Sequence, residues 1–99
     1  MEYTVANDMC GVALHGDLTF SDHQTFRRMA ERLFAENAAE IVIDLQHLEF
    51  IDSSGLGMLL IARDEAGKRN RHIVLKGAHG QVRKMFDISR FETLFSLEP

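Results

Sequence analysis

The 99-residue sequence predicts an α/β domain with a mixed β-sheet, mostly parallel at its centre, and helices packed mainly on one face. Three observations predict it. Two β-prone runs open the chain close together, which indicates an N-terminal antiparallel hairpin. Apolar runs of strand character then alternate with runs of helical spacing, and strands separated by single helices pair in parallel through right-handed crossovers. The length fits one domain over residues 1–99 with a single buried core.

The opening hairpin is predicted from residues 3–6 and 10–15, which flank the segment "NDM". The following "HGDLTF" (residues 15–20) is expected to lead into a loop. Cys10 lies in the second run and is expected to be a small core residue. It is the only cysteine, so no intrachain disulfide can form, which fits a reducing cytoplasm.

The segment "SDHQTFRRMAERLFAEN" (residues 21–37) carries the clearest helical pattern. Ser21 and Gln24 have the spacing of a capping box, and Asp22 adds a negative charge where the helix dipole favours it. Apolar residues recur at i, i+3, i+4 and i+7 and predict one buried face, made of Phe26, Met29, Ala30, Leu33 and Phe34.

Next, "EIVIDL" (residues 40–45) predicts a strand buried on both faces. Residues 53–68 predict a helix that ends in the basic segment "GKRNR". One stripe of this helix is expected to be core, with three further residues widening it: Leu56, Leu59, Leu60 and Ala66, then Met58, Ile61 and Ala62. Leu56 and Met58 have a second interpretation, as part of a partner surface.

The C-terminal third predicts a strand over residues 72–78 and a short helix over residues 80–89. Val82, Met85 and Phe86 are expected to face inward from this helix. Residues 94–97 can add a short closing strand.

Charge and hydropathy exclude some function classes. The net charge of −4 argues against nucleic acid as the main partner, because phosphate binding needs a basic surface. Residues 1–52 carry 3 basic and 10 acidic side chains, and residues 53–99 carry 8 and 5, which indicates either a mixed solvated shell or an acidic partner-facing side. No apolar run approaches a membrane span and no signal peptide opens the chain, so we expect a cytoplasmic protein without membrane contact.

The sequence lacks the common catalytic patterns. None of the five histidines (His15, His23, His47, His72 and His79) has a metal-ligand spacing, and no glycine-rich phosphate loop is present. Ser53 and Ser54 do not sit in a Gly-x-Ser-x-Gly elbow, because Ile51 and Asp52 occupy the preceding glycine positions. Asp44 and Asp52 are a weak candidate carboxylate pair. We therefore expect no catalysis, metal or cofactor, and a small hydrolase using Ser53 or Ser54 is the least favoured class.

The informative stretch is "FIDSSGLGMLLIA" (residues 50–62), where polar and very small residues join a strand to a helix. A serine there can simply cap the helix, worth about 1 kcal/mol. However, three polar residues stand in a row, and Gly55 and Gly57 each cost the helix about 1 kcal/mol relative to alanine. This favours an exposed contact surface with a hydroxyl at the positive end of a helix. A phosphate on that hydroxyl would suit the helix end but stand beside Asp52, and could spoil a close-fitting interface.

These residues resemble a known family. "IDLQHLEFIDSSGLGMLL" (residues 43–60) is similar to the signature of STAS domains, in particular of bacterial anti-sigma factor antagonists. The flanking "GDLTF" (residues 16–20) and "VRKMFDISRFETLF" (residues 82–95) resemble the family more weakly. The resemblance covers nearly the whole chain.

The resemblance implies a partner-switching protein. It implies that Ser53 is phosphorylated by a histidine-kinase-like (GHKL) ATPase that acts as anti-sigma factor and serine kinase, and that a PP2C-type phosphatase restores the hydroxyl. Only the unphosphorylated form would bind the ATPase. The implied contact surface contains Asp17, Thr19, Asp52, Ser54, Gly55, Leu56 and Gly57.

One departure leaves an alternative open. Well-studied members often carry Asp where this chain has Thr19, so either the interaction with the kinase differs in detail or the partner does not control a sigma factor. The alternative is a STAS module that does not switch: a scaffold in a larger assembly, or a component associated with a transporter. Related proteins also regulate secretion, motility or biofilm signalling through similar kinases.

Overall fold

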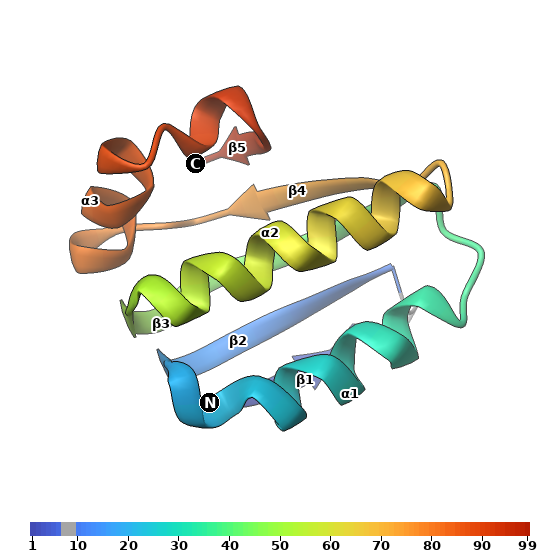
Figure 1. Ribbon diagram of the computed structural model, residues 1–99, viewed down its shortest axis with the longest axis horizontal. Coiled ribbons are helices and arrows are strands. Elements are labelled where there is room, and N and C mark those ends of the chain that lie inside the picture. The colour runs from blue at the N-terminus through green and yellow to red at the C-terminus, as the bar shows by residue number, and fades with distance from the viewer. Residues whose placement is uncertain (7–9) are drawn as a thin grey trace.

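The computed structural model describes residues 1–6 and 10–99, so the connection of the predicted hairpin lies outside the described residues. Five strands form one sheet in the order β1-β2-β3-β4-β5 (Figure 1). The first pair is antiparallel and all later pairs are parallel. The strands are β1 (Glu2–Val5), β2 (Gly11–Leu18), β3 (Glu40–Ile51), β4 (His72–Lys76) and β5 (Ser96–Glu98).

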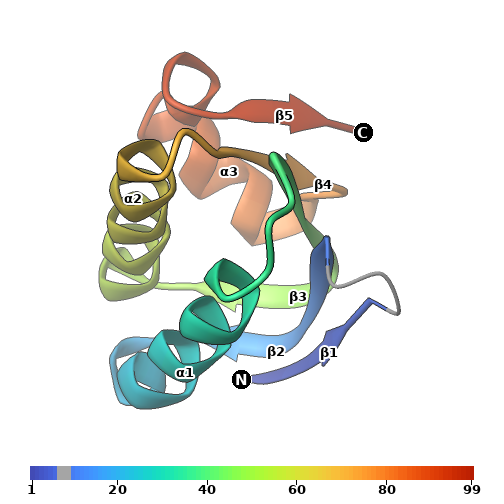
Figure 2. The same ribbon diagram turned by 90° about the vertical axis from the view of Figure 1, so that its right-hand side faces the viewer.

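The helices are α1 (His23–Phe34), α2 (Ser53–Lys68) and α3 (Gly80–Ile88), with short 3-10 turns η1 (Phe20–Asp22) and η2 (Phe91–Thr93). Helices α1 and α2 lie side by side on one face of the sheet (Figure 2), and α3 lies beyond the end of β4 (Figure 1). The predicted fold class is confirmed: a mixed sheet with an antiparallel N-terminal pair, a parallel remainder and helices mainly on one face.

Strand β3 alternates, contrary to the prediction that it is buried on both faces. Ile41, Ile43 and Leu45 point into the core, whereas Val42 and Asp44 are only half-buried. The helices cover one face and leave the other face to solvent, so the β-branched run here reflects strand propensity rather than burial on two sides.

Strands β2 and β3 are both longer than predicted. Gly16–Leu18, expected to begin a loop, continue β2 and pair with β3, with a register shift between Gly16 and Asp17. Strand β3 runs on to Ile51, although the pairing of β4 ends where Lys76 meets Asp44. The last seven residues of β3 therefore project past β4, and the carboxyl ends of β2 and β3 meet at one end of the molecule (Figure 1).

The start of α1 differs from the predicted capping box of Ser21 and Gln24. A turn of 3-10 helix comes first, and the Asp22 carboxylate accepts hydrogen bonds from the Thr19 backbone N–H at 2.8 Å and the Met1 ammonium at 2.7 Å. Burial by itself would raise the pKa of the Asp22 carboxyl, but these bonds outweigh it and hold the pKa below its ordinary value.

Most predicted core positions are buried, Leu60 and Met85 are partly buried, and three further positions on α1 and α2 are informative exceptions. Ile61 of α2, expected in the core, is 61% exposed. Ala30 and Phe34 of α1 are only half-buried. All three line a groove between α1 and α2, so the two helices do not close against each other along their whole length.

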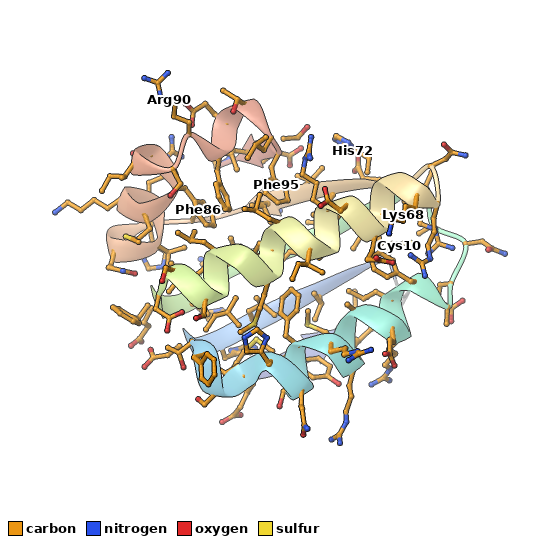
Figure 3. All side chains as sticks on the ribbon, viewed as in Figure 1. Cys10, Lys68, His72, Phe86, Arg90 and Phe95 are labelled. Carbon is orange, nitrogen blue, oxygen red and sulfur yellow. The ribbon has the colours of Figure 1, made fainter. Side chains whose placement is uncertain are left out.

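An aromatic cluster attaches the C-terminal segment to the core. The ring of Phe86 stacks on Phe91 at 4.8 Å between centroids, and Phe91 lies 5.1 Å from Phe95. Figure 3 shows Phe86 and Phe95 on the side of this segment that faces α2, with Arg90 directed outwards. Cys10, expected in the core, is half-buried. Within residues 1–6 and 10–99, no helix is long and apolar enough to cross a membrane.

Candidate functional site

Asp52, and not either serine, caps helix α2. Its backbone is extended and its Oδ1 accepts a hydrogen bond from the Gly55 N–H at 2.8 Å. Ser53 is the first helical residue and is exposed. Among the residues that the structure describes, no hydrogen bond involves the Ser53 hydroxyl, because the capping role that could have occupied it belongs to its neighbour.

The same carboxylate connects α2 to the turn that follows β2. The second oxygen of Asp52, Oδ2, accepts a hydrogen bond from the Phe20 N–H at 3.2 Å. The Asp52 N–H in turn donates to the Leu18 carbonyl oxygen at 3.2 Å. Residues 18–20 and 52–55 are therefore held as one unit.

Gln81 fixes the projecting end of β3. Its Oε1 accepts from the Ile51 N–H at 2.9 Å, and its Nε2 donates to the Ile51 carbonyl at 2.8 Å. These bonds replace the partner strand that β4 no longer provides, since buried backbone groups must find other partners. His79 contributes a further bond on this edge, between Nε2 and the Gln46 carbonyl oxygen at 2.7 Å. The role of Gln81 could not be predicted from the sequence, because no local pattern relates it to Ile51, thirty residues away.

Two predicted surface residues lie in the interior. A Cβ atom added at Gly55 would stand 2.5 Å from the Leu18 carbonyl oxygen and 2.6 Å from Ile51 Cγ1. The glycine thus permits close packing of α2 on the ends of β2 and β3. Leu56 is buried in the core, as is Met58. Neither Gly55 nor Leu56 therefore lies on the predicted contact surface, and for Leu56 and Met58 the core interpretation is confirmed.

The exposed side of α2 next to Ser53 carries small residues. Ser54 and Gly57 are partly exposed, and a Cβ added at Gly57 would meet nothing within 4 Å. Packing inside this chain therefore does not require the glycine at position 57, although it costs the helix about 1 kcal/mol relative to alanine. Ile61 follows one turn later on the same side of the helix.

The turn after β2 supplies the neighbouring part of the site. Asp17 is exposed and pairs with Phe50 at the end of the sheet. Thr19 is half-buried, and its hydroxyl lies 3.3 Å from Asp22 Oδ2. Two phenylalanines that the sequence analysis did not assign to the site are exposed here: Phe20 is 71% exposed and Phe50 is 42% exposed. The structure thus brings Asp17, Thr19, Asp52 and Ser53 to one end of the molecule, where Phe20 in η1 and Phe50 in β3 are also exposed.

The remaining candidates serve local contacts. Asp44 Oδ1 accepts from the Gln46 N–H at 2.9 Å, and Asp52 caps α2, so each carboxylate is engaged close to its own position. The rings of His15 and His47 stack at 5.3 Å on the uncovered face of the sheet. Within the described residues, no three His, Cys, Asp or Glu side chains gather in a group that could hold a metal ion.

The comparisons with known proteins establish the family. The family model described as "Mlab, STAS domain" matches residues 1–98, so the chain belongs to the STAS domain family. A curated relative, the STAS-domain containing protein PA14_20770 of Pseudomonas aeruginosa (strain UCBPP-PA14), is 42% identical over 87% of this chain and 84% of its own length. A second, named "Putative anti-sigma factor antagonist BtrV" from Bordetella bronchiseptica, is 34% identical over 67% of this chain and 63% of its own length.

Solved structures share the fold. An anti-sigma factor antagonist from Mycobacterium paratuberculosis superposes with a TM-score of 0.79, at 21% identity, over 90% of this chain and 75% of that chain. A sulfate transporter family protein from Wolinella succinogenes gives a TM-score of 0.76, at 14% identity, over 96% of this chain and 80% of that chain. The same architecture therefore occurs in proteins of both kinds, and the choice between them depends on the site.

Proposed function

We propose that this chain is an anti-sigma factor antagonist of the partner-switching type, with Ser53 as its phosphoacceptor. In the unphosphorylated state it binds a histidine-kinase-like (GHKL) ATPase that acts as anti-sigma factor and serine kinase. Phosphorylation of Ser53 releases it, and a PP2C-type phosphatase restores it. The chain itself performs no catalysis.

The observation that carries this proposal is the exposed Ser53 hydroxyl at the first position of α2, with capping done by Asp52. A kinase can reach this hydroxyl without breaking a hydrogen bond that the fold needs. Gln81 holds the end of β3 and Asp52 holds the first turn of α2, so the position of the Ser53 hydroxyl is fixed by hydrogen bonds on both sides. The 34% identity to a relative named as an anti-sigma factor antagonist supports the same class.

The phosphoryl transfer uses only the hydroxyl of this chain. Ser53 Oγ forms a bond to the γ-phosphorus of ATP, the bond from that phosphorus to the bridging oxygen breaks, and ADP leaves. The kinase takes the hydroxyl proton. In the return step, water attacks the phosphoserine at phosphorus in the phosphatase, which regenerates the hydroxyl and inorganic phosphate.

The free energies involved explain why phosphorylation of Ser53 should weaken binding to the partner without unfolding the protein. A phosphate on Ser53 adds a charge of about −1.5 to −2 beside the Asp52 carboxylate. In water, two unit charges 4 Å apart repel by only about 1 kcal/mol, which is small against a folding free energy of about 5–15 kcal/mol. In a closed interface the same phosphate would have to lose its water, which costs several kcal/mol when no cation pairs with it.

The experiment compares two neighbouring serines. We expect Ser53→Asp to lose binding to the purified ATPase by titration calorimetry, and Ser53→Ala to bind but to accept no phosphate by intact-mass analysis. Ser54→Ala, the matched control, should still be phosphorylated. Equal binding by wild type and Ser53→Asp, or a phosphate on Ser54 instead, would contradict the proposal.

A second candidate function is a STAS module that does not switch, associated with a transporter. The shared architecture with the sulfate transporter family protein favours it. In that case the wild-type chain would gain no phosphate from any histidine-kinase-like ATPase that it binds, and Ser53→Ala would behave as wild type throughout.

A further inference from the structure

We propose that the groove between α1 and α2 receives an amphipathic helix of the ATPase that phosphorylates Ser53. This inference rests on the proposed function, but it concerns a surface that contains neither the acceptor serine nor its supporting residues. It assigns a role to Ile61, which the fold leaves 61% exposed, and to the half-buried Ala30 and Phe34 in the same groove.

The groove is large and has an apolar floor. Its volume is about 740 Å³, as large as many small-molecule binding sites. Its apolar lining includes Phe26, Ala30 and Phe34 from α1, and Met58, Ile61 and Ala62 from α2. A large aliphatic side chain left 61% exposed at Ile61 gains about 1 kcal/mol or more if a partner covers it.

Position links the groove to the acceptor serine. Ile61 follows Ser53 by eight residues, which is about 12 Å along the helix. Between them the exposed side of α2 carries Gly57, above which there is open space. At the start of α1, His23 lines the groove and its ring meets the exposed Phe20 edge to face at 5.3 Å. A protein that touches Ser53 can therefore extend over a continuous small and apolar surface into the groove.

The rim favours a helix over a small charged ligand. Arg27 is paired with Glu31 on the α1 side, and Arg69 with Glu65 on the α2 side at 3.0 Å. The Arg69 guanidinium also stacks over the Phe34 ring at 4.8 Å. These charges neutralise each other along both edges, so none of them is left to anchor a single ionic group. An amphipathic helix with an apolar stripe and charges of both signs fits such a groove.

A second copy of this chain fits less well. Two-fold pairing would place hollow against hollow, and inserting the exposed Ile88 of one copy into the groove of the next would give an open chain of copies rather than a closed dimer.

The test uses two matched charge insertions. Ile61→Asp and Ile88→Asp each replace an exposed aliphatic residue, 61% and 76% exposed, and only Ile61 lines the groove. We expect Ile61→Asp to weaken binding of the ATPase about tenfold or more in titration calorimetry, whereas Ile88→Asp changes it less than about twofold. Urea unfolding of both variants confirms that each remains folded.

Methyl spectra provide an independent readout. With alanine methyl groups labelled, addition of the ATPase should shift the Ala30 and Ala62 signals in the groove and leave Ala13, on β2 outside it, unchanged.

The outcomes separate the two proposals. Phosphorylation of Ser53 together with equal binding by Ile61→Asp would overturn the groove proposal and leave the proposed function standing. Loss of self-association in Ile61→Asp during sedimentation would assign the groove to a second copy instead. Absence of any phosphate on Ser53 would overturn both proposals.

Discussion

At the scale of single residues, the two glycines at the start of α2 have opposite roles. Gly55 lies against the backbone of Leu18 and is required by the packing of this chain, whereas Gly57 faces open space. Sequence reasoning treated them alike, since both lower helix propensity within the same two turns. Only the positions of β2 and β3 distinguish them, and those positions depend on residues far away in the chain.

The same substitution at these two positions should therefore have opposite effects. Gly55→Ala should lower the free energy of unfolding by about 1–3 kcal/mol, because the added Cβ overlaps atoms that cannot easily move. Gly57→Ala should raise it by about 0.5–1 kcal/mol, since the helix gains a better former with no new contact. Urea unfolding measures both. A destabilised Gly57→Ala would contradict the open space above that residue.

Thr19 stands where the resemblance to the family leads us to expect an aspartate, and its contacts give a structural reason for a threonine there. Its backbone and hydroxyl both lie against the Asp22 carboxylate. An aspartate at position 19 would place a second carboxylate beside the first, and like charges at such short range repel. A threonine at position 19 therefore suits the contact with the Asp22 carboxylate better than an aspartate would.

At the scale of elements, the hydrophobic periodicity predicted the type and order of the helices and strands well, but it predicted their boundaries less well. The predicted limits of α2 are confirmed, because an apolar run follows a polar cap directly and a basic segment ends it. The strand ends were missed. Residues 46–51 lack an apolar alternation that distinguishes a strand from a link, and they are held in β3 by pairing with β2 and by the side chain of Gln81.

Gln81 should therefore be important for the end of β3. Gln81→Ala removes both bonds to Ile51 and should cost about 1–2 kcal/mol, with faster hydrogen exchange at the Ile51 amide. Gln81→Glu keeps an acceptor for the Ile51 N–H but turns a carboxylate towards the Ile51 carbonyl, so it should not restore full stability. An unchanged hydrogen-exchange rate at the Ile51 amide in Gln81→Ala would show that these two hydrogen bonds are not needed to hold the end of β3.

At the scale of the whole molecule, the fold class could be predicted because the alternation of elements leaves few topologies. The groove between α1 and α2 could not be predicted from the sequence. Ala30, Phe34 and Ile61 belong to apolar stripes that predict burial, and whether two such stripes meet depends on how far apart α1 and α2 sit on the sheet. The spacing of the helices is set by all the strands together, and no single segment encodes it.

Global stability should fall in acid through Asp22. The hydrogen bonds from the Met1 ammonium and Thr19 outweigh burial and lower the pKa of Asp22 in the folded state. Its contribution is present above the ordinary pKa of an aspartate and is lost as the pH falls through the folded pKa. We expect unfolding free energy to drop below about pH 4, more steeply in wild type than in Asp22→Asn.

One carboxylate joins two stretches of chain that are separated by more than thirty residues, and this has a consequence for protein engineering. Asp52 accepts hydrogen bonds from both the first turn of α2 and the Phe20 amide. If only the turn after β2 or only the start of α2 were exchanged between relatives, the two segments would no longer be matched at this contact. A chimera that exchanges this end of the molecule should therefore transplant residues 17–22 and 52–57 as a pair and keep Gln81, whose side chain holds Ile51.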